Sequence, residues 1–403
     1  MLQSTLFPKT KTEAPKDEQA INAKFLLRGG FIDKLMAGSY SLLPLGRLVE
    51  RKIEQIVREE MDKTGAEEVL MPLLHPKEIW NETGRWESAT EVMYKLQKDD
   101  KNYALSFTHE EIVMDIIRKH VTSYKDLPVL LYHFSTKFRS ELRAKSGILR
   151  GREFLMKDLY SAHATEEGMW KYYWEVADAY MRVYERLGLK PIIAEASGGV
   201  FTTNTTHEFQ IESEVGEDTI YMADGWKYAK NEEVMTDEDK KASGLRTITS
   251  IEAGNIFPFG PQKYAEKMGG NFTDKDGSKK PVWFASYGIG ITRLMGILVE
   301  VSHDERGIIW PRSAAPFGVH LIELGENKAK NLYHKLGEAG IPVLYDERDL
   351  GAGAKFADSD LIGIPVRLVI SEKTGDKIEW RERSKKETEL LTEEEVINRL
   401  KQV

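Results

Sequence analysis

The sequence predicts an α+β domain followed by a small α/β domain of about ninety residues. Helical and strand-like segments both occur before Pro311, whereas short apolar strands and helical segments alternate after it. The chain has 403 residues, of which 41% are hydrophobic and 30% charged. These values are typical of a soluble globular protein of about two or three domains, with a core large enough to need no covalent cross-links.

The composition excludes several kinds of protein. The chain has no cysteine, which excludes disulfides, thiolate zinc sites and cysteine nucleophiles and fits a reducing compartment. No apolar run approaches the ~20 residues of a membrane span, and the N-terminal segment has no apolar signal core. We therefore expect a cytoplasmic protein without a membrane partner. The net charge of −8 argues against non-specific coating of nucleic acid, but not against a partner that docks on a local basic surface.

The first clear helix follows a glycine-containing, loop-like segment at residues 29–46 and ends at Gly65. Its apolar residues recur at helical spacing: Leu48, Val49, Ile53, Ile56, Val57 and Met61. The next segment, "EEVLMPLL", has the composition of a strand that is interrupted by Pro72. Because proline has no N–H to donate to a ladder, we expect this strand at a sheet edge or a junction.

Residues 165–188 predict a second helix. An apolar stripe at helical spacing is more often core than a cofactor site, so we expect these residues to be buried: Trp170, Trp174, Ala177, Met181 and Tyr184. The segment "HEFQIESE" alternates as a strand does, with Phe209 and Ile211 on one face and the intervening polar residues on the other. Residues 231–250 are polar and predict a surface connector or small insertion.

Strand and helix patterns also follow that connector. "PVWFAS" predicts a strand, and "YGIGITRLMGILVE" a glycine-rich turn that enters a helix. In the small domain, "VHLIEL", "IPVLYD" and "VRLVIS" predict strands with helices between them, and a last helix begins at Thr392.

The segment Phe138 to Phe154, "FRSELRAKSGILRGREF", is strongly basic within an acidic chain. Its basic residues are Arg139, Arg143, Lys145, Arg150 and Arg152. We expect an antiparallel hairpin with a basic tip, in which Arg139 and Glu141 share one face and Arg152 and Phe154 share one face of the returning strand. Guanidinium groups bind phosphate, a carboxylate accepts from an exocyclic amine, and a phenyl ring stacks on a base. The set suits a nucleotide; the alternative is a solvated hairpin whose charges bind nothing specific.

A second anion-binding candidate lies in "GIGITR". Its glycines permit close backbone approach, and helix N-termini favour anions. Arg293 in the first helical turn opposes the helix dipole, so its position suggests a phosphate partner rather than a stabilising role. The alternative is a tight turn without a ligand.

Candidates for binding cations are fewer. In "SFTHEE", Thr108 and Glu110 are close enough to converge on a small cationic ligand, although Thr108 could also be a helix N-cap. Glu208 could help hold a magnesium ion, or lie on a solvated sheet face. The segment "TDKDGS" lacks the later ligands of a calcium loop, and no histidine pair has HExxH spacing. We predict no structural zinc.

Several of these segments resemble the motifs of class II aminoacyl-tRNA synthetases. "GAEEVLMPLL" with its preceding helix is similar to motif 1, "FRSE" with "GREFLMKDLYSAH" to motif 2, and "YGIGITR" to motif 3. The chain more closely resembles bacterial-type prolyl-tRNA synthetases, over nearly its whole length and in the right order: "FTHEE", "TKFRSE", "REFLMKD", "HEFQ", "DERGIIWP" and "KFADSDLIGIP". Because only about twenty polar residues separate motifs 2 and 3, it resembles the short forms without an inserted editing domain.

The resemblance implies an antiparallel catalytic sheet flanked by helices, followed by an anticodon-binding domain. It implies these limits: catalytic core with motifs 1 and 2 at residues 1–230, connector at 231–250, remainder of the core with motif 3 at 251–312, and anticodon-binding domain at 313–403. The family activates L-proline with ATP and Mg²⁺ to prolyl adenylate, then transfers the prolyl group to tRNA(Pro). Motif 1 implies a homodimer through the helix at 47–64 and the strand to Pro72.

The resemblance also implies roles for individual residues. Arg139 would bridge the proline carboxylate and the α-phosphate, Glu141 would bind the adenine amino group, and Phe154 would stack on adenine. The other ATP-binding residues would be Arg150, Arg152, Thr205 and Arg293. The proline pocket would be formed by Thr108, Glu110, His207 and Ser286, the last where bacterial relatives usually carry cysteine. The anticodon contacts would come from Asp346, Arg348, Lys355 and Phe356.

Without an editing domain, such an enzyme is expected to form alanyl adenylate and to leave Ala-tRNA uncleared, since one missing methylene changes discrimination by only ~10–200-fold. A separate editing protein would then be a further partner. Two alternatives remain: a non-catalytic paralogue that binds RNA or regulates another enzyme, and a synthetase for threonine or histidine. The first usually lacks a motif arginine, and the threonine enzymes use a zinc site with cysteine.

Overall fold

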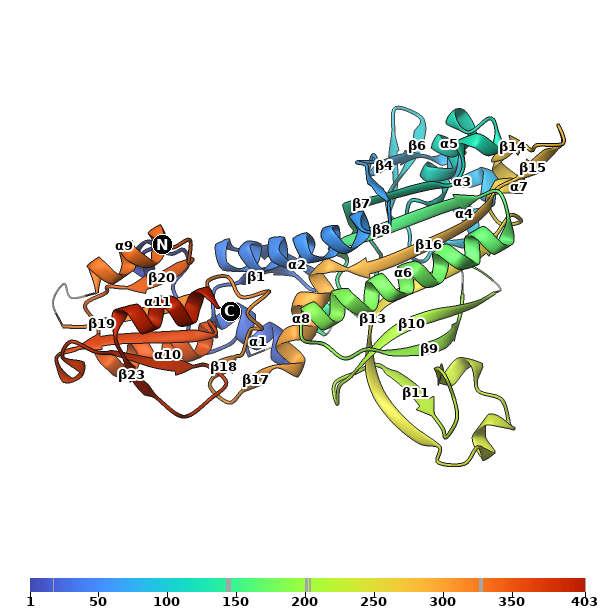
Figure 1. Cartoon of the computed structure of the whole chain (residues 1–403). Helices are drawn as coiled ribbons and strands as arrows, with labels where there is room; N and C mark the ends of the chain where they lie inside the picture. The colour runs from blue at the N-terminus through green and yellow to red at the C-terminus, as the bar shows by residue number, and fades with distance from the viewer. Residues whose placement is uncertain (17, 143–145, 200–201, 203, 326–328, 403) are drawn as a thin grey trace. The chain divides into compact units, whose positions relative to one another are not determined.

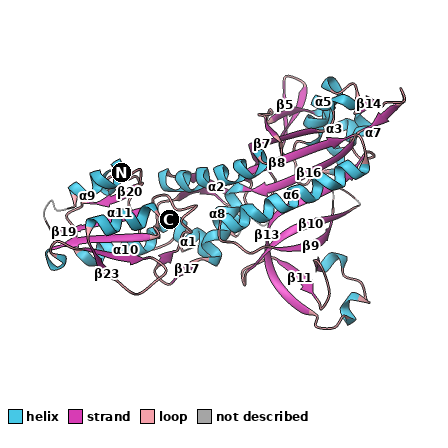
Figure 2. Cartoon of the chain, viewed as in Figure 1, coloured by secondary structure: helices cyan, strands magenta, loops and turns pink. Residues whose placement is uncertain are grey.

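The computed structural model describes the chain except residues 17, 143–145, 200–201, 203, 326–328 and 403. Arg143 and Lys145 of the basic segment therefore lie outside the described residues. The chain divides into two compact units. The small unit comprises Met1–Met36, Tyr40–Ile53 and Leu298–Val403, and the large unit comprises Ala37–Ser39 and Glu54–Ile297. Figures 1 and 2 show their helices and strands.

The large unit is built on one long sheet. In the described part of this unit, nine strands lie in the order β10-β9-β12-β11-β13-β16-β8-β7-β3. The pairs of longer strands, β7 with β8, β8 with β16, β16 with β13 and β13 with β10, are all antiparallel, which confirms the expected antiparallel sheet. The strands are β3 (Glu67–Glu68), β7 (Val129–Phe138), β8 (Glu153–His163), β9 (Ile192–Ser197), β10 (Thr205–Glu212), β11 (Asp218–Met222), β12 (Ala229–Asn231), β13 (Arg246–Gly260) and β16 (Trp283–Gly290).

A single cross-strand row positions the polar residues of this sheet. His133 of β7 lies opposite Asp158 of β8, which lies opposite Gly288 of β16. Gly288 in turn lies opposite Asn255 of β13, and Asn255 lies opposite Glu208 of β10. Directly opposed residues point to the same face, so these strands bring polar side chains from across the sheet to one face.

Helix α6 (Glu166–Arg186) covers the other face, where it packs along β8, β16 and β13 (Figure 1). The predicted helix is confirmed, but its buried stripe is partly displaced. Ala177 and Tyr184 are buried as predicted, whereas Trp170, Trp174 and Met181 are only half-buried, and Tyr173 and Tyr180 are fully buried in their place. The stripe differs because tyrosine rings fill the helix–sheet contact, while Trp174 stacks on Tyr228.

The motif 1 segment is close to the prediction. Helix α2 (Pro44–Asp62) begins at a proline, which is favoured at the first helical position. The following strand β3 is the last strand in the order of the sheet, as expected for an edge strand. The strand is shorter than predicted, since it ends at Glu68 and does not reach Pro72, and β4 (Leu74–Pro76) joins a separate three-stranded sheet with β5 (Lys95–Lys98) and β6 (Lys101–Leu105).

Two predictions about the segments near the sheet were wrong. Residues 246–250 are not a connector but the first part of β13, because Ile248 and Ser250 alternate into the interior against β11. Between β12 and β13 the structure describes 3-10 turns at Glu232–Val234 and Asp239–Lys241. The glycines of "YGIG" are not in a turn either, because β16 continues to Gly290 and helix α8 (Ile291–Val301) begins at the next residue.

Short elements surround one end of the sheet: α3 (Lys77–Thr83), α4 (Arg85–Ser88), α5 (Glu110–His120), α7 (Ala265–Met268), β14 (Asn271–Thr273) and β15 (Lys279–Pro281). Their apolar side chains share a core that includes Trp80, Phe107, Met114 and Tyr264.

The small unit confirms the predicted alternation of strands and helices. Within its described residues, five strands lie in the order β20-β19-β21-β22-β23, and the first three are parallel. They are β19 (Val319–Leu324), β20 (Val343–Asp346), β21 (Val366–Ser371), β22 (Ile378–Glu382) and β23 (Glu389–Leu391). The helices are α1 (Ile21–Arg28), α9 (Lys330–Glu338), α10 (Ala352–Ile362) and α11 (Glu393–Lys401), and Thr392 caps the last. Short strands are β1 (Ile32–Met36), β2 (Ser39–Leu42), β17 (His303–Asp304) and β18 (Gly307–Ile308). A search of the described helices found none with the length and apolarity to cross a membrane.

Candidate active site

A cavity of about 340 Å³ opens on the large unit, a volume that suits a small ligand. Ser286 and Gly288 line it, whereas Tyr287 between them packs against Tyr172 of α6. The cavity therefore lies on the face of the sheet opposite α6. Residues predicted from widely separated segments meet in its wall: Thr108, Glu110, Arg139, Glu208, Ser286 and Arg293.

Two arginines line the cavity, and Arg139 is the one without a carboxylate partner among the described residues. It follows β7 directly, and its backbone N–H donates to the Arg152 carbonyl. Its Nε donates to the Phe107 carbonyl at 3.3 Å, and its guanidinium carbon lies 5.4 Å from the centre of the Phe154 ring. Among the described residues, no carboxylate lies within 4.0 Å of this guanidinium. Burial, and then the charge of Arg293, lower the pKa of Arg139. An anionic ligand would therefore stabilise the charged guanidinium.

Arg293 lies in the first turn of α8, as predicted, and is paired. Its Nη1 lies 3.1 Å from Glu252 Oε2, and its Nε donates to the Leu149 carbonyl at 2.8 Å. Arg293 and Glu252 also line a neighbouring pocket together with Arg150. The arginines are thus distributed along one continuous path from Arg139 toward Arg150.

Strands β7 and β8 form the predicted antiparallel hairpin, but its tip differs from the prediction. The strand stops at Phe138, so Arg139 and Glu141 are not placed by strand alternation; the Glu141 N–H instead donates to the Arg139 carbonyl in a turn. Glu141 Oε2 accepts from Arg150 Nε at 2.9 Å, and its carbonyl accepts from Arg152 Nε at 3.0 Å. Glu141 thus joins Arg150 and Arg152, although Glu141, Arg150, Arg152 and Phe154 are not among the residues that line the cavity.

Thr108 and Glu110 converge as predicted, but Thr108 is not a helix cap. The N-cap of α5 is His109, and Thr108 Oγ1 instead donates to Glu110 Oε2 at 2.6 Å. The same carboxylate oxygen accepts from Arg85 Nη1 at 3.1 Å. Arg85 also pairs with Glu111 at 3.1 Å. A buried network therefore fixes the carboxylate that faces the cavity.

Glu208 is not on a solvated face. Its carboxylate accepts hydrogen bonds from the side chains of Gln210, Asn231 and Asn255 at 2.8–3.1 Å. Burial, followed by the negative charge of Glu252, raises the pKa of Glu208 to about 8. The side-chain oxygens of Gln210 and Asn255 are buried without a hydrogen-bond partner among the described residues. Carboxylate and amide oxygens with unused capacity match the ligands that Mg²⁺ prefers.

The structure does not bring Thr205 and His207 into the cavity. Thr205 is exposed at the start of β10. His207 faces α6, where its Nδ1 lies 2.8 Å from the Tyr173 hydroxyl and its ring lies 4.8 Å from the Trp174 ring. Neighbouring residues of a strand point to opposite faces, so His207 turns away where Glu208 turns toward the cavity. Its assignment to the proline pocket is corrected on this ground.

Sequence reasoning missed three groups of residues at this site. Glu252 pairs with Arg293, Arg85 binds Glu110, and Asp158 lines the cavity above Lys137. A signal was available for Lys137, because polar residues recur at period two in "HFSTKF". No local pattern marks Arg85 or Glu252, since their partners are distant in sequence.

The four candidate anticodon residues have different surroundings. Asp346 is buried and accepts from Arg348 Nε at 2.8 Å. Lys355 is also buried and donates to the Glu323 carbonyl at 2.6 Å. Arg348 and Phe356 are partly buried, with the Arg348 side chain 13% exposed and paired with Asp346 and Asp358. The structure places Asp346 and Lys355 in the interior of the small unit.

Comparisons with known proteins agree with this architecture. A family model described as "tRNA synthetase class II core domain (G, H, P, S and T)" matches residues 94–302, and one described as "Anticodon binding domain" matches residues 318–403. The fold and the site thus define a class II aminoacyl-tRNA synthetase.

Similar proteins of known activity identify the family within this class. The chain is 39% identical to the proline–tRNA ligase of Agrobacterium fabrum, covering 96% of this chain and 97% of that protein. It is 38% identical to the enzyme of Paracoccus denitrificans, covering 100% and 98%. The chain belongs to the prolyl-tRNA synthetase family. The fold is also shared with a Cryptosporidium parvum prolyl-tRNA synthetase crystallised with halofuginone and AMPPNP, with a TM-score of 0.79 at 18% identity over 94% of this chain and 76% of that one.

Proposed function

We propose that this chain is a proline–tRNA ligase that activates L-proline with ATP and transfers the prolyl group to tRNA(Pro). The observation that supports this most is that one cavity is lined both by a cation and by carboxylates. Arg139 is a half-buried cation without an acidic partner, which suits a carboxylate and a phosphate. Glu110 and Asp158 supply the negative charge that an amino group requires.

The cationic and the acidic residues of the site have different roles in the reaction. Attack of a carboxylate on the α-phosphate brings two anions together, and Arg139 lies where it can offset their repulsion. Arg293 and Arg150 continue the positive path for the departing phosphates. Glu208 and Glu252 are the residues that would hold Mg²⁺, which supplies charge neutralisation for the phosphates when bound. Positioning and electrostatics carry this reaction, so the absence of cysteine is no obstacle.

Amino-acid-dependent ATP–pyrophosphate exchange tests this proposal. We expect exchange with proline among the twenty amino acids, and its loss in Arg139→Ala. Arg399→Ala is the control, because Arg399 pairs with Glu389 on the exposed surface of the small unit. Exchange with threonine or histidine would assign another substrate, and no exchange with any amino acid would favour the non-catalytic paralogue.

We also propose a homodimer that uses the motif 1 segment. Leu70 follows the edge strand β3 and is 85% exposed, and Leu74 begins β4 and is 51% exposed. Exposed apolar side chains beside an unpaired strand edge favour association. Light scattering should give twice the 46.0 kDa chain mass, and Leu70→Glu should lower it. A monomer at micromolar concentration would refute the dimer.

We propose that the chain lacks cis editing. The alignment with the Agrobacterium relative spans 426 residues and covers 97% of that protein, so this relative also lacks a large inserted domain. The purified enzyme should form alanyl adenylate and leave Ala-tRNA(Pro) intact, which leaves clearance to a separate protein. Hydrolysis of Ala-tRNA(Pro) well above the uncatalysed rate would contradict this.

The remaining assignments are proposals on the same basis. The catalytic core extends to residue 312, with its connector at 231–245, and the domain at 313–403 binds the anticodon. Arg348 and Phe356 are the retained candidates for that contact, since neither is fully buried. A cytoplasmic location fits the absence of cysteine.

A further inference from the structure

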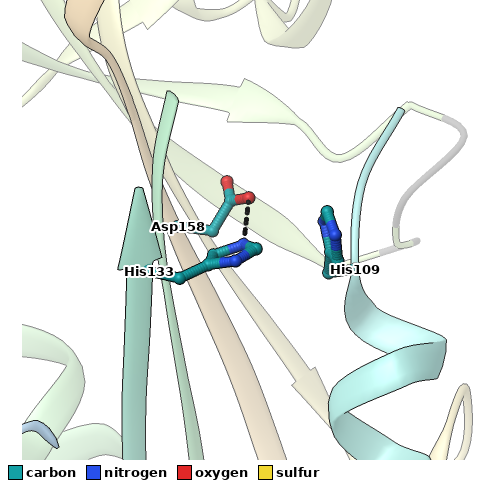
Figure 3. Close-up of side chains that lie close together, drawn as sticks. All are labelled: His109, His133 and Asp158. Atoms are coloured by element: carbon teal, nitrogen blue, oxygen red, sulfur yellow. Dashed lines mark hydrogen bonds and ion pairs between the residues drawn. The ribbon is translucent and has the colours of Figure 1, made fainter. Parts of the chain in front are cut away.

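The side chains in Figure 3 have the composition of a metal site, but a lysine already fills it. One ligand atom from each of His109, His133 and Asp158 can be chosen so that the three atoms lie within 4.8 Å of one another. The Lys137 ammonium lies within 3.2 Å of an atom of each of these side chains. The lysine is therefore the cation of this cluster and leaves no position for a metal ion. A surface with unused binding capacity lies instead on the small unit.

Residues 2–11, the edge segment, run along the outer strand of the five-stranded sheet of the small unit. Leu2 forms a parallel bridge with Tyr345 of β20, the first strand in the order of that sheet. Gln3 is buried, and its Oε1 lies 2.7 Å from His320 Nε2. Figure 1 accordingly shows the beginning of the chain beside β20. The edge segment is therefore part of the small unit, which contains the candidate residues for the anticodon contact.

Two hydroxyl residues anchor the edge segment to acids that surround Arg348. The Ser4 hydroxyl donates to Glu347 Oε1, and the Ser4 N–H donates to Glu347 Oε2 at 3.4 Å. Thr10 Oγ1 donates to Asp358 Oδ1 at 2.6 Å. The other oxygen of Asp358 accepts from Arg348 Nη2 at 2.8 Å. Both anchors therefore lie next to Arg348, which is one of the retained candidates for the anticodon contact.

Phe7 lies midway between these anchors, and its side chain is 68% exposed. Three extended residues span at most ~11 Å, so the Phe7 Cα lies within that distance of the Cα atoms of Ser4 and Thr10. A single exposed apolar residue is common on protein surfaces, so its exposure alone identifies no ligand. Here the ring belongs to a segment that is anchored on both sides of it, and a phenyl face is therefore presented to solvent at a fixed place beside Arg348.

Two lysines accompany this ring. Lys9 Nζ donates to the Gln3 carbonyl at 3.2 Å and to the Ser4 carbonyl, and Lys11 is exposed. Among the described residues, no carboxylate lies within 4.0 Å of either ammonium, so neither positive charge is neutralised. Exposed aromatic rings with nearby cations bind single-stranded nucleic acid, because bases stack on the rings and the cations attract the phosphates. The edge segment therefore has the chemistry of an RNA-binding surface.

We propose that the edge segment binds the tRNA substrate, with Phe7 stacked on an unpaired base and with Lys9 and Lys11 near the phosphates. Ser4 and Thr10 are positioning residues, because they anchor the segment that carries the ring. The proposal rests on the proposed function, since it names a further contact between that enzyme and its RNA substrate. Unpaired bases of RNA loops are free to stack on an aromatic side chain, whereas paired bases are not.

Phe7→Ala provides the central test, because truncation of an exposed side chain leaves the core intact. Loss of one base–aromatic stack lowers affinity ~5–150-fold, so we expect the KM for tRNA(Pro) in aminoacylation to rise at least about fivefold. The KM for proline in pyrophosphate exchange, measured without tRNA, should stay within twofold. Phe7→Trp should keep the wild-type KM for tRNA(Pro). Phe7→Leu, which is apolar but has no aromatic face, should resemble Phe7→Ala.

Leu390→Ala is the matched control. Leu390 is 58% exposed and lies in β23, at the opposite end of the strand order of the same sheet. We expect this variant to keep the KM for tRNA(Pro) within twofold. An equal rise in Leu390→Ala and Phe7→Ala would mean that any loss of exposed apolar surface has this effect, and it would overturn the assignment of Phe7.

The anchors and the lysines have tests of their own. Thr10→Val removes the hydroxyl at nearly constant shape and should raise the KM for tRNA(Pro) about threefold without changing kcat, whereas Thr10→Ser should keep it. The double variant Thr10→Val/Phe7→Ala should be no worse than Phe7→Ala, which would mean that the threonine acts through the position of the ring. Lys11→Gln should reduce the slope of log KM against log salt concentration by about 0.7, the value for one phosphate contact on a single strand.

The outcomes are distinct from failure of the proposed function. If the wild type charges tRNA(Pro) but Phe7→Ala keeps the KM for tRNA(Pro) within twofold, the inference is overturned and the proposed function stands. If the wild type charges no tRNA, the proposed function is overturned, and a gel shift of the full chain with tRNA(Pro) then decides the inference. A Kd that Phe7→Ala leaves unchanged overturns it, and a Kd raised fivefold or more supports it.

Discussion

Arg85 joins two buried carboxylates, and its removal should destabilise the large unit strongly. The Arg85 side chain is 4% exposed, and those of Glu110 and Glu111 are 4% and 0% exposed. Removing one partner of a buried ion pair costs ~3–5 kcal/mol, because the charge that remains is uncompensated. We therefore expect Arg85→Met to lower the free energy of unfolding by several kcal/mol.

The structure places this cost near the lower end of that range. Each carboxylate retains a hydroxyl donor, Thr108 for Glu110 at 2.6 Å and Thr83 for Glu111 at 2.7 Å. Burial raises the pKa of Glu111, so this group can take up a proton when the arginine is lost. At ~3 kcal/mol and ~2–4 °C per kcal/mol for a unit of this size, the Tm should fall by about 10 °C.

The assay is thermal unfolding monitored by circular dichroism between pH 5 and pH 8. A buried carboxyl whose folded pKa is raised loses stability as pH rises from its unfolded pKa toward its folded one, so the deficit of Arg85→Met should be larger at pH 8. The double variant Arg85→Met/Glu111→Gln should recover about half of the loss. Arg399→Met, which removes an exposed ion pair with Glu389, should cost less than ~1 kcal/mol. A Tm of Arg85→Met within 2 °C of the wild type would refute the reasoning.

Two further predictions concern the cavity and the face behind it. Gly288→Ala should raise the KM for proline ~10-fold without lowering the Tm. The added methyl would meet Met156 Sδ and Asp158 Oδ1 at 3.8 Å, so it fits without a clash but occupies cavity space. Pyrophosphate exchange measures the KM, and thermal unfolding measures the Tm. His207→Phe should leave that KM within twofold. It should also reduce the loss of stability between pH 6.5 and pH 4, since burial lowers the pKa of His207 to about 4 and the unfolded chain binds the extra proton in that window.

Each of these two predictions can be contradicted by one measurement. Gly337→Ala is the control for the glycine variant, because a Cβ there meets nothing within 4 Å, and an equal rise in KM for both would remove the argument from cavity volume. A tenfold rise in the KM for proline with His207→Phe would return this histidine to the pocket, against the face on which the structure places it.

Local patterns in the sequence determined much of this architecture. The helix at residues 44–62, the edge strand before Pro72 and the alternating small domain follow from periodicity and from the chemistry of proline. The basic character around Arg139 and the proximity of Thr108 to Glu110 could also be predicted, because each feature involves residues that are close together in the sequence.

The sequence also contained a conflict that the structure resolved. His207 and Glu208 were both assigned to ligands of one site, yet neighbours on a strand face opposite sides. The structure turns Glu208 toward the cavity and His207 toward α6. A resemblance to a family transfers residue identities, whereas the face is decided by strand register.

Only the tertiary structure decided which charges are compensated. Arg293 finds Glu252, Glu110 finds Arg85, and Lys137 finds Asp158, whereas Arg139 has no acidic partner within 4.0 Å in the described chain. Arg293 and Glu252 lie in α8 and β13, Glu110 and Arg85 begin α5 and α4, and Lys137 and Asp158 lie on the paired strands β7 and β8. These pairings depend on how the elements pack against one another, and no local pattern encodes them. The sequence by itself therefore determined which charged groups the site contains, and the packing of the sheet determined which of them are left open for a ligand.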